Sequence, residues 1–135
     1  MVYLFFSGPL MDLFNSDDMT TETSGNSSLQ IQEMVAGSGE IAERGDIISA
    51  HYVGRLIDGR VFDSSRDRGM PISFTLGVGQ VIRGWDEGLQ GMRVGGKRTL
   101  TISPEYAYGT QAVGGIPANS TLIFEVELVD VQKSR

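Results

Sequence analysis

The chain has 135 residues, of which 40% are hydrophobic and 21% charged, with no cysteine and a single histidine, His51. This length supports one domain with a hydrophobic core of its own. The lack of cysteine and the single histidine exclude a disulfide framework, thiolate chemistry and a histidine-rich metal site, so we expect no metal and no other cofactor.

The formal net charge of −6 is unevenly distributed along the chain. The first 43 residues carry seven Asp or Glu and no Lys or Arg, whereas residues 44–135 carry ten acidic and eleven basic residues. The second part is therefore almost neutral and has no basic stripe that could follow a phosphate backbone. We expect no binding of nucleic acid.

The apolar segment from Met1 to Phe14 raises the question of targeting. It has no positively charged start and no small-residue cleavage site, Pro9 and Asp12 interrupt it, and it is too short to span a bilayer. We therefore expect a soluble, cytoplasmic protein without a membrane partner. Met11 and Met19 are alternative start positions, and translation from either would leave the apolar tip out of the protein.

Residues 15–28 are rich in Asp, Ser, Thr, Asn and Gly and contain almost no apolar side chain. This composition is typical of a flexible linker. We therefore divide the chain into a flexible acidic N-terminal arm with an apolar tip, residues 1–27, and a folded domain, residues 28–135.

From Leu29 onward most apolar residues alternate with polar ones, which indicates half-buried β-strands. In the segment 47–53, this parity places Tyr52 on the apolar face and His51 on the opposite face. The Asp58-Gly59 pair is a hairpin signal. Three later segments repeat the alternation, with the apolar positions at Ile72, Phe74 and Leu76, at Leu100 and Ile102, and at Leu122, Phe124, Val126 and Leu128.

The segment from Val78 to Met92 follows a different period, opening like a loop and continuing like a short amphipathic helix. Its glycines cost about 1 kcal/mol each relative to alanine, so tertiary packing must hold this helix. The only tryptophan, Trp85, lies on its apolar face and is either a core residue or the floor of a concave site. The apolar face comprises Val81, Ile82, Trp85, Leu89 and Met92. With about five antiparallel strands, this helix predicts an α+β domain in which one sheet face packs on the helix.

The residues offer little for conventional catalysis. Ser64 and Ser65 could serve as nucleophiles only with a base nearby, and parity predicts that His51 points away from them. Asp63 and Asp67 resemble paired carboxylates, but the arginines beside them, Arg66 and Arg68, favour ordinary ion pairs.

Phosphate-binding motifs are incomplete as well. Gly77-Val78-Gly79 begins a dinucleotide fingerprint, but Ile82 occupies the place of its third glycine. Gly114-Gly115 lacks the Lys-Ser/Thr of a phosphate loop. These observations favour a site that needs neither acid–base nor covalent chemistry.

Three motifs occur in order without large insertions: Val61-Phe62-Asp63-Ser64-Ser65-Arg66-Asp67-Arg68, Val81-Ile82-Arg83-Gly84-Trp85 and Ser103-Pro104-Glu105-Tyr106-Ala107-Tyr108-Gly109. Over residues 28–131 the chain thereby resembles the FKBP-type peptidyl-prolyl cis–trans isomerases, the macrolide-binding immunophilins. The resemblance implies a bent antiparallel sheet wrapped around one short helix. It also implies a rotamase that accelerates rotation about Xaa-Pro bonds, assists protein folding and binds tacrolimus- or rapamycin-type macrolides.

The resemblance also implies roles for particular residues. Trp85 would lie beneath the prolyl ring, Tyr108 would donate its hydroxyl to a substrate carbonyl, and the Ile82 N–H would hold another carbonyl. Asp63, held by Tyr52 and Arg68, would be the polar residue over the rotating bond. The catalytic set is then Asp63, Tyr108, Phe62 and Trp85, and the binding set is Tyr52, Phe62, Asp63, Arg68, Ile72, Gln80, Val81, Ile82, Trp85, Tyr108, Ile116 and Phe124. From the residues alone, Phe124 could equally be a core phenylalanine and Tyr108 a turn tyrosine.

Three positions depart from the best-known members of the family: Gln80 replaces a glutamate, Ile72 replaces an aromatic wall, and Ala112 stands where a larger side chain is common. The expected partners are Pro-containing peptides, unfolded proteins and macrolide inhibitors, bound by a monomer. The alternative is a module or weak chaperone that binds proline segments with little turnover. An adaptor whose acidic arm recruits a partner is compatible with either function.

Overall fold

The computed structural model describes residues 28–134. The expected arm, residues 1–27, lies outside them. The elements are β1 (Leu29–Val35), β2 (Ile47–Leu56), β3 (Val61–Ser64), α1 (Ser65–Arg68), β4 (Ile72–Thr75), α2 (Arg83–Gly88), β5 (Lys97–Ile102), the 3₁₀ helix η2 (Pro104–Tyr106) and β6 (Leu122–Gln132). No helix within residues 28–134 is long and apolar enough to cross a membrane.

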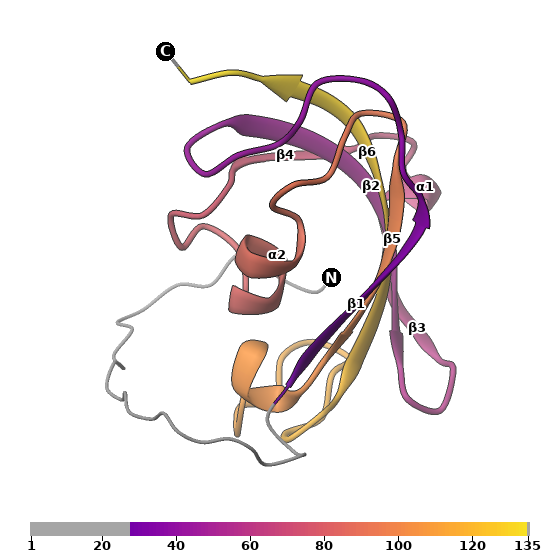
Figure 1. Cartoon of the computed structure of the whole chain (residues 1–135). Helices are drawn as coiled ribbons and strands as arrows, with labels where there is room; N and C mark the ends of the chain where they lie inside the picture. Colours follow the sequence, from indigo (N-terminus) through magenta and orange to yellow (C-terminus); the bar gives the residue numbers. More distant parts are fainter. Residues whose placement is uncertain (1–27, 135) are drawn as a thin grey trace.

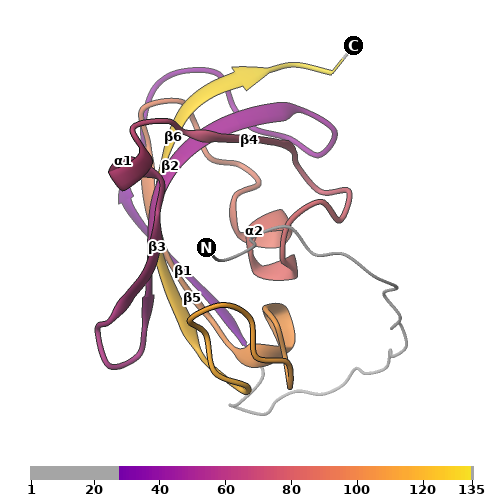
Figure 2. The same ribbon diagram turned by 180° about the vertical axis from the view of Figure 1, so that it is seen from behind.

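One antiparallel sheet organises the domain, with strand order β1-β5-β6-β2-β3 and with β4 also paired to β2. The sheet bends around α2, which lies against its concave face, while α1 lies on the other side (Figures 1 and 2). This confirms the expected α+β class. Within residues 28–134 the sheet has six strands rather than about five. The additional strand is β1, which is exposed along most of its length and is not among the predicted segments.

The expected alternation of faces is confirmed in the long central strands. In β2, Ile48, Ala50 and Tyr52 are buried, whereas Ser49 and His51 on the opposite face are only partly so. In β6 the four expected inward residues, Leu122, Phe124, Val126 and Leu128, are also buried. The core therefore fills the space between the concave face and α2.

Helix α2 is shorter than its apolar pattern, but every residue of the predicted apolar face is buried. Two of its glycines explain how it packs. A Cβ atom on Gly84 would lie 2.7 Å from Ile102, and one on Gly88 would lie 3.0 Å from Leu100, both on β5. The glycines that weaken the isolated helix are thus the residues that let it approach the sheet.

The C-terminal end of the domain is tied to the start of β2 by a buried carboxylate. Asp46 accepts hydrogen bonds from Lys133 Nζ at 2.6 Å, from the Ser134 N–H at 3.0 Å and from the Glu43 N–H at 2.9 Å. The hydrogen bond from Lys133 contributes most to a lowered pKa of Asp46, and burial of the carboxyl opposes it. The charged form of Asp46 is therefore the form that stabilises this end of the fold.

We predict that Asp46→Asn lowers the free energy of unfolding at neutral pH and that this loss shrinks in acid. Because the folded pKa is lowered, the contribution is complete above the unfolded pKa of about 3.9 and is lost as pH falls through the folded value. Urea unfolding of both proteins at several pH values measures this difference. Asp130→Asn, at an exposed carboxylate of β6, is the control. A loss of equal size in acid would mean that charge does not contribute.

Candidate active site

Aromatic rings gather on the concave side around Trp85. The ring centroid of Trp85 lies 5.2 Å from that of Tyr52 and 5.3 Å from that of Phe124, and both pairs meet edge to face. Phe62 meets Phe124 in the same way at 5.5 Å, and Phe74 is tilted against Trp85 at 5.6 Å. Such pairs stabilise each other beyond the apolar area they bury, so the rings hold one another in fixed orientations.

Gly54 in β2 makes room for this aromatic cluster. A Cβ atom there would lie 2.7 Å from Phe62 Cζ and 2.8 Å from Phe124 Cε1, closer than side chains can approach. Gly54 is not among the residues predicted from the sequence to shape the site. A lone glycine inside a strand pattern is the signal that could have found it, because it marks a close approach of another group.

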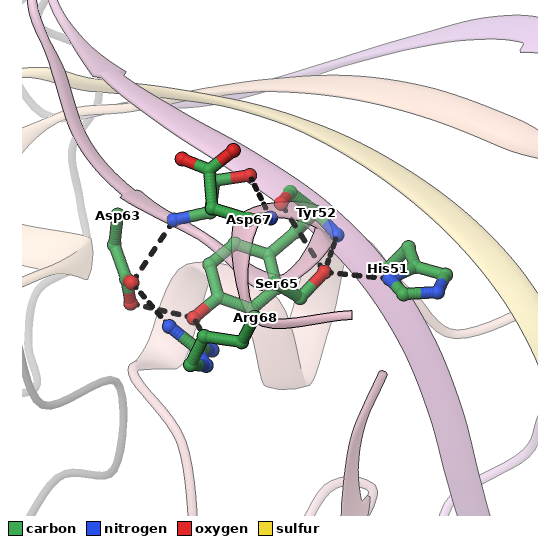
Figure 3. Close-up of polar contacts among 7 residues, drawn as sticks. His51, Tyr52, Asp63, Ser65, Asp67 and Arg68 are labelled. Atoms are coloured by element: carbon green, nitrogen blue, oxygen red, sulfur yellow. Dashed lines mark hydrogen bonds and ion pairs between the residues drawn. The ribbon is translucent and has the colours of Figure 1, made fainter. Parts of the chain in front are cut away.

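A polar group of three side chains borders the rings (Figure 3). Tyr52 Oη donates to Asp63 Oδ2 at 2.5 Å, Arg68 Nη1 donates to Asp63 Oδ1 at 2.6 Å, and Arg68 Nη2 donates to Tyr52 Oη at 2.9 Å. The Ser64 N–H completes the partners of Asp63 at 2.9 Å. The structure therefore brings Tyr52, Asp63 and Arg68 together as the sequence analysis expected. Arg66 pairs instead with Glu127, on β6.

Two phenols of the site titrate far from neutrality. Burial raises the pKa of Tyr52 to about 12, with the Asp63 hydrogen bond adding to the shift and Arg68 opposing it. Burial is also the main cause of a raised pKa of Tyr108, and the charges of Tyr52 and Asp63 contribute. Tyr108 is partly buried and packs against the hydrophobic core. Both phenols remain hydroxyl donors at neutral pH.

Two side chains hold the loop before α2. Asp86 of α2 accepts the N–H groups of Gly77 and Gly79, each at 2.8 Å, and Gln80 Oε1 accepts the Thr75 N–H at 2.9 Å. Ile82 immediately precedes the first helical residue, so the helix does not use its N–H. Asp86, which the sequence analysis passed over, therefore fixes the loop that presents the Ile82 backbone.

A second loop approaches the rings from the other side. Val113 and Ile116 exchange backbone hydrogen bonds at 2.9 and 2.8 Å, and Ile116 is buried. A Cβ atom on Gly115 would lie 3.9 Å from Phe62 Cβ, which places the tip of this loop against the aromatic cluster.

The other residues that the sequence placed in or near the site differ in how far they are buried. Val81 is buried in the core beside the rings, and Ile72 is half-buried against it. Gln80 is exposed, with its side-chain oxygen engaged by Thr75, and Ala112 is exposed on the second loop.

One expectation was wrong. His51 does not point away from Ser65: His51 Nδ1 lies 2.8 Å from Ser65 Oγ. Parity correctly placed His51 on the convex face of β2, but α1 also packs on that side and carries Ser65 to it. Ser65 is fully buried, with its hydroxyl on the Tyr52 backbone, so this pair presents no accessible nucleophile.

The chemistry available at the site is therefore that of binding and desolvation. Apolar walls surround a small polar group, in which the carboxylate already has three donors. Within residues 28–134, no group of three or more His, Asp or Glu side chains is arranged to hold a metal ion.

We predict that kcat/KM for cis–trans isomerisation of an Xaa-Pro peptide, the reaction that the resemblance implies, stays constant between about pH 7 and about pH 10. An ordinary tyrosine would ionise near the upper limit, but burial disfavours the phenolate, so Tyr52 and Tyr108 should keep their protons throughout. An NMR exchange assay, which needs no coupling protease, gives this profile. A fall in activity with a midpoint near pH 10, absent from Tyr108→Phe, would contradict the prediction.

Comparison with known proteins agrees with this geometry. A family model described as FKBP-type peptidyl-prolyl cis-trans isomerase matches residues 38–129. An FK506-binding protein 1A of Neurospora crassa is 54% identical over 115 residues, which cover 84% of this chain and 95% of that protein. An FK506-binding protein of Neisseria meningitidis is 55% identical over 105 residues, covering 77% of this chain and 96% of that protein.

A solved structure shares the fold. The crystal structure of FkpA from Escherichia coli matches with a TM-score of 0.74 and 48% sequence identity, covering 84% of this chain and 52% of that chain. The family model spans more than half of the chain, and both relatives align over nearly their whole length. The chain therefore belongs to the FKBP-type peptidyl-prolyl cis–trans isomerases.

Proposed function

We propose that this isomerase binds the prolyl ring of its substrates against the aromatic cluster. Trp85 would be the floor, and Tyr52, Phe62, Val81, Ile82 and Phe124 the walls. The observation that carries the proposal is the edge-to-face packing of Tyr52 and Phe124 on Trp85, directly beside the Tyr52–Asp63–Arg68 group. An apolar ring and a polar backbone could bind there side by side.

The physics of prolyl isomerisation fits such a surface. Rotation about the amide has a barrier of about 18–20 kcal/mol, and the planar ground state is more polar than the twisted transition state because resonance separates its charge. An apolar, water-poor environment therefore disfavours the ground state more than the transition state. No proton transfer is needed to lower this barrier.

The polar residues then take orienting roles. Tyr108 would donate its hydroxyl to one substrate carbonyl, and the Ile82 N–H would hold another. Asp63, fixed by Tyr52 and Arg68, would lie over the rotating bond. Ile116 would cover the bound ring from the loop that packs against Phe62.

We also propose that the same surface binds FK506- and rapamycin-type macrolides, because the relatives named above are FK506-binding proteins. Ile72, Gln80 and Ala112 would tune the affinity. Ile72 offers an aliphatic side chain in place of an aromatic wall, and Gln80 is neutral and engaged with Thr75.

We propose that residues 28–135 form the isomerase domain, residues 1–27 a flexible arm, and that the enzyme acts as a cytoplasmic monomer on Pro-containing segments of folding proteins. The near-neutral charge of residues 44–135 supports targets other than nucleic acid.

The proposal is tested by turnover of Leu-Pro and Phe-Pro tetrapeptides in a protease-coupled or NMR exchange assay, with and without rapamycin. Turnover that rapamycin inhibits competitively is the expected result. Peptide binding without turnover would instead identify a proline-binding module or weak chaperone.

We predict that Trp85→Ala and Phe62→Ala lower kcat/KM more than Tyr108→Phe or Asp63→Ala. The walls should matter more because shape and desolvation, not proton transfer, lower the barrier. No single substitution should reach the roughly 10⁴-fold loss seen when a catalytic triad loses a member. Urea unfolding identifies variants that fold, and Val61→Ala, at an exposed neighbour on β3, is the control. Abolished turnover in a folded Tyr108→Phe or Asp63→Ala variant would refute this mechanism.

We predict that the chain from Thr23 onward folds and turns over like the full chain. The expected outcome is an unchanged KM after removal of residues 1–22. The tethered, apolar segment around Pro9 could compete for the site, because a tether raises its effective concentration to about the millimolar range. A several-fold fall in KM, reversed by adding the peptide back, would establish autoinhibition and contradict the prediction.

A further inference from the structure

Ser65 and His51 lie outside the aromatic cluster. His51 precedes Tyr52 on β2, and Ser65 contacts the backbone of Tyr52. We propose that Ser65, held by His51, is a positioning residue that fixes the Tyr52 backbone and the single turn of α1, and thereby orients Arg68 and Asp63. This inference rests on the site proposed above. It gives a positioning role to a histidine–serine pair that takes no part in the reaction itself.

The first observation is a gap along one edge of β2. That edge pairs with β4 from Ile47 to Ala50 and with β3 from Val53 to Arg55, so His51 and Tyr52 lie between the two ladders. Ser65 Oγ accepts the Tyr52 N–H at 2.8 Å and donates to the Tyr52 carbonyl at 3.3 Å. A hydroxyl can accept and donate at once, so Ser65 takes the place of a strand partner.

The second observation is the contact with His51, drawn in Figure 3. The Ser65 oxygen has two acceptor positions and one hydrogen. The Tyr52 N–H occupies one acceptor position and the Tyr52 carbonyl takes the hydrogen. The remaining position accepts a hydrogen bond from His51 Nδ1, 2.8 Å away. In the proposed arrangement the imidazole proton therefore lies on Nδ1, and the hydrogen and both acceptor positions of this buried hydroxyl have partners.

The third observation connects this anchor to the site. A helix of one turn does not hold its shape without tertiary contacts, and α1 spans only Ser65–Arg68. Ser65 is its first residue and is fully buried, whereas Arg68 is its last and binds both Asp63 and Tyr52 Oη. Release of Ser65 would free the turn and with it the guanidinium that holds the carboxylate.

The decisive experiment is a double-mutant cycle between Ser65→Ala and Arg68→Ala. We expect Ser65→Ala to lower kcat/KM about fivefold, the size of one positioning hydrogen bond. If Ser65 acts through Arg68, the double variant will be no slower than Arg68→Ala alone. Independent, additive effects in folded proteins would overturn the proposal, and so would unchanged kcat/KM in Ser65→Ala.

Ser49→Ala is the matched control. This substitution removes the 2.7 Å hydrogen bond between the Ser49 and Ser73 hydroxyls, on the face of β2 that also carries His51. It should leave kcat/KM unchanged. Urea unfolding of each variant checks that the proteins compared are folded.

Variants at His51 keep the proposal testable should Ser65→Ala fail to fold. His51→Leu removes the hydrogen bond and should lower kcat/KM, whereas His51→Asn keeps a polar group within reach of Ser65 and should restore most of it. Equal kcat/KM in His51→Leu and wild type would count against the role of His51.

NMR tests the network without reference to turnover. The ¹⁵N shifts of His51 should show a protonated Nδ1 in the wild type, and the Tyr52 amide should exchange faster in Ser65→Ala. A wild type with the proton on Nε2 would reject the anchor. If this network is intact but replacing rings of the aromatic cluster leaves turnover unchanged, the proposed function is rejected. The positioning role of Ser65 in the structure would then stand.

Discussion

Close packing of α2 against β5 is the constraint on which the rest of the structure depends. Gly84 and Gly88 have no side chain on the face that meets Ile102 and Leu100, so the helix axis comes closer to the sheet than larger residues would permit. Arg98 of β5 closes the end of the helix, with Nη1 donating to the Gly88 carbonyl at 2.8 Å. The helix itself has little intrinsic stability. Its position, and with it the position of Trp85, is set by the sheet.

The site combines two kinds of rigidity. Rings that meet edge to face have few alternative arrangements, and Gly54 leaves room for Phe62 and Phe124 to reach theirs. Beside them a short network of charged and hydroxyl groups holds Asp63 in one orientation. An enzyme that lowers a barrier by shape and desolvation needs this fixed geometry more than it needs reactive groups.

The sequence predicted what depends on local periodicity and missed what depends on contacts between distant segments. The two-residue period correctly placed Tyr52 and Phe124 on the concave face, and the motif around Trp85 correctly marked the helix. Parity says on which side of β2 His51 lies but not which segment covers that side, so its contact with Ser65 was missed. The pairing of Arg66 with Glu127, on a strand 61 residues away, was missed for the same reason.

The place of β6 in the sheet has a consequence for how the protein is made. This strand lies between β5 and β2 and pairs Gln132 with Ile47, so the middle of the sheet is completed only after residues 122–132 have been synthesised. Pairings between residues so far apart in the chain form slowly because long loops must close first. While synthesis continues, the unpaired edges of β2 and β5 face the solvent, where pairing with other nascent chains competes with folding. Slow synthesis of the segment from β5 to the end of β6 would therefore prolong the time during which these edges are exposed.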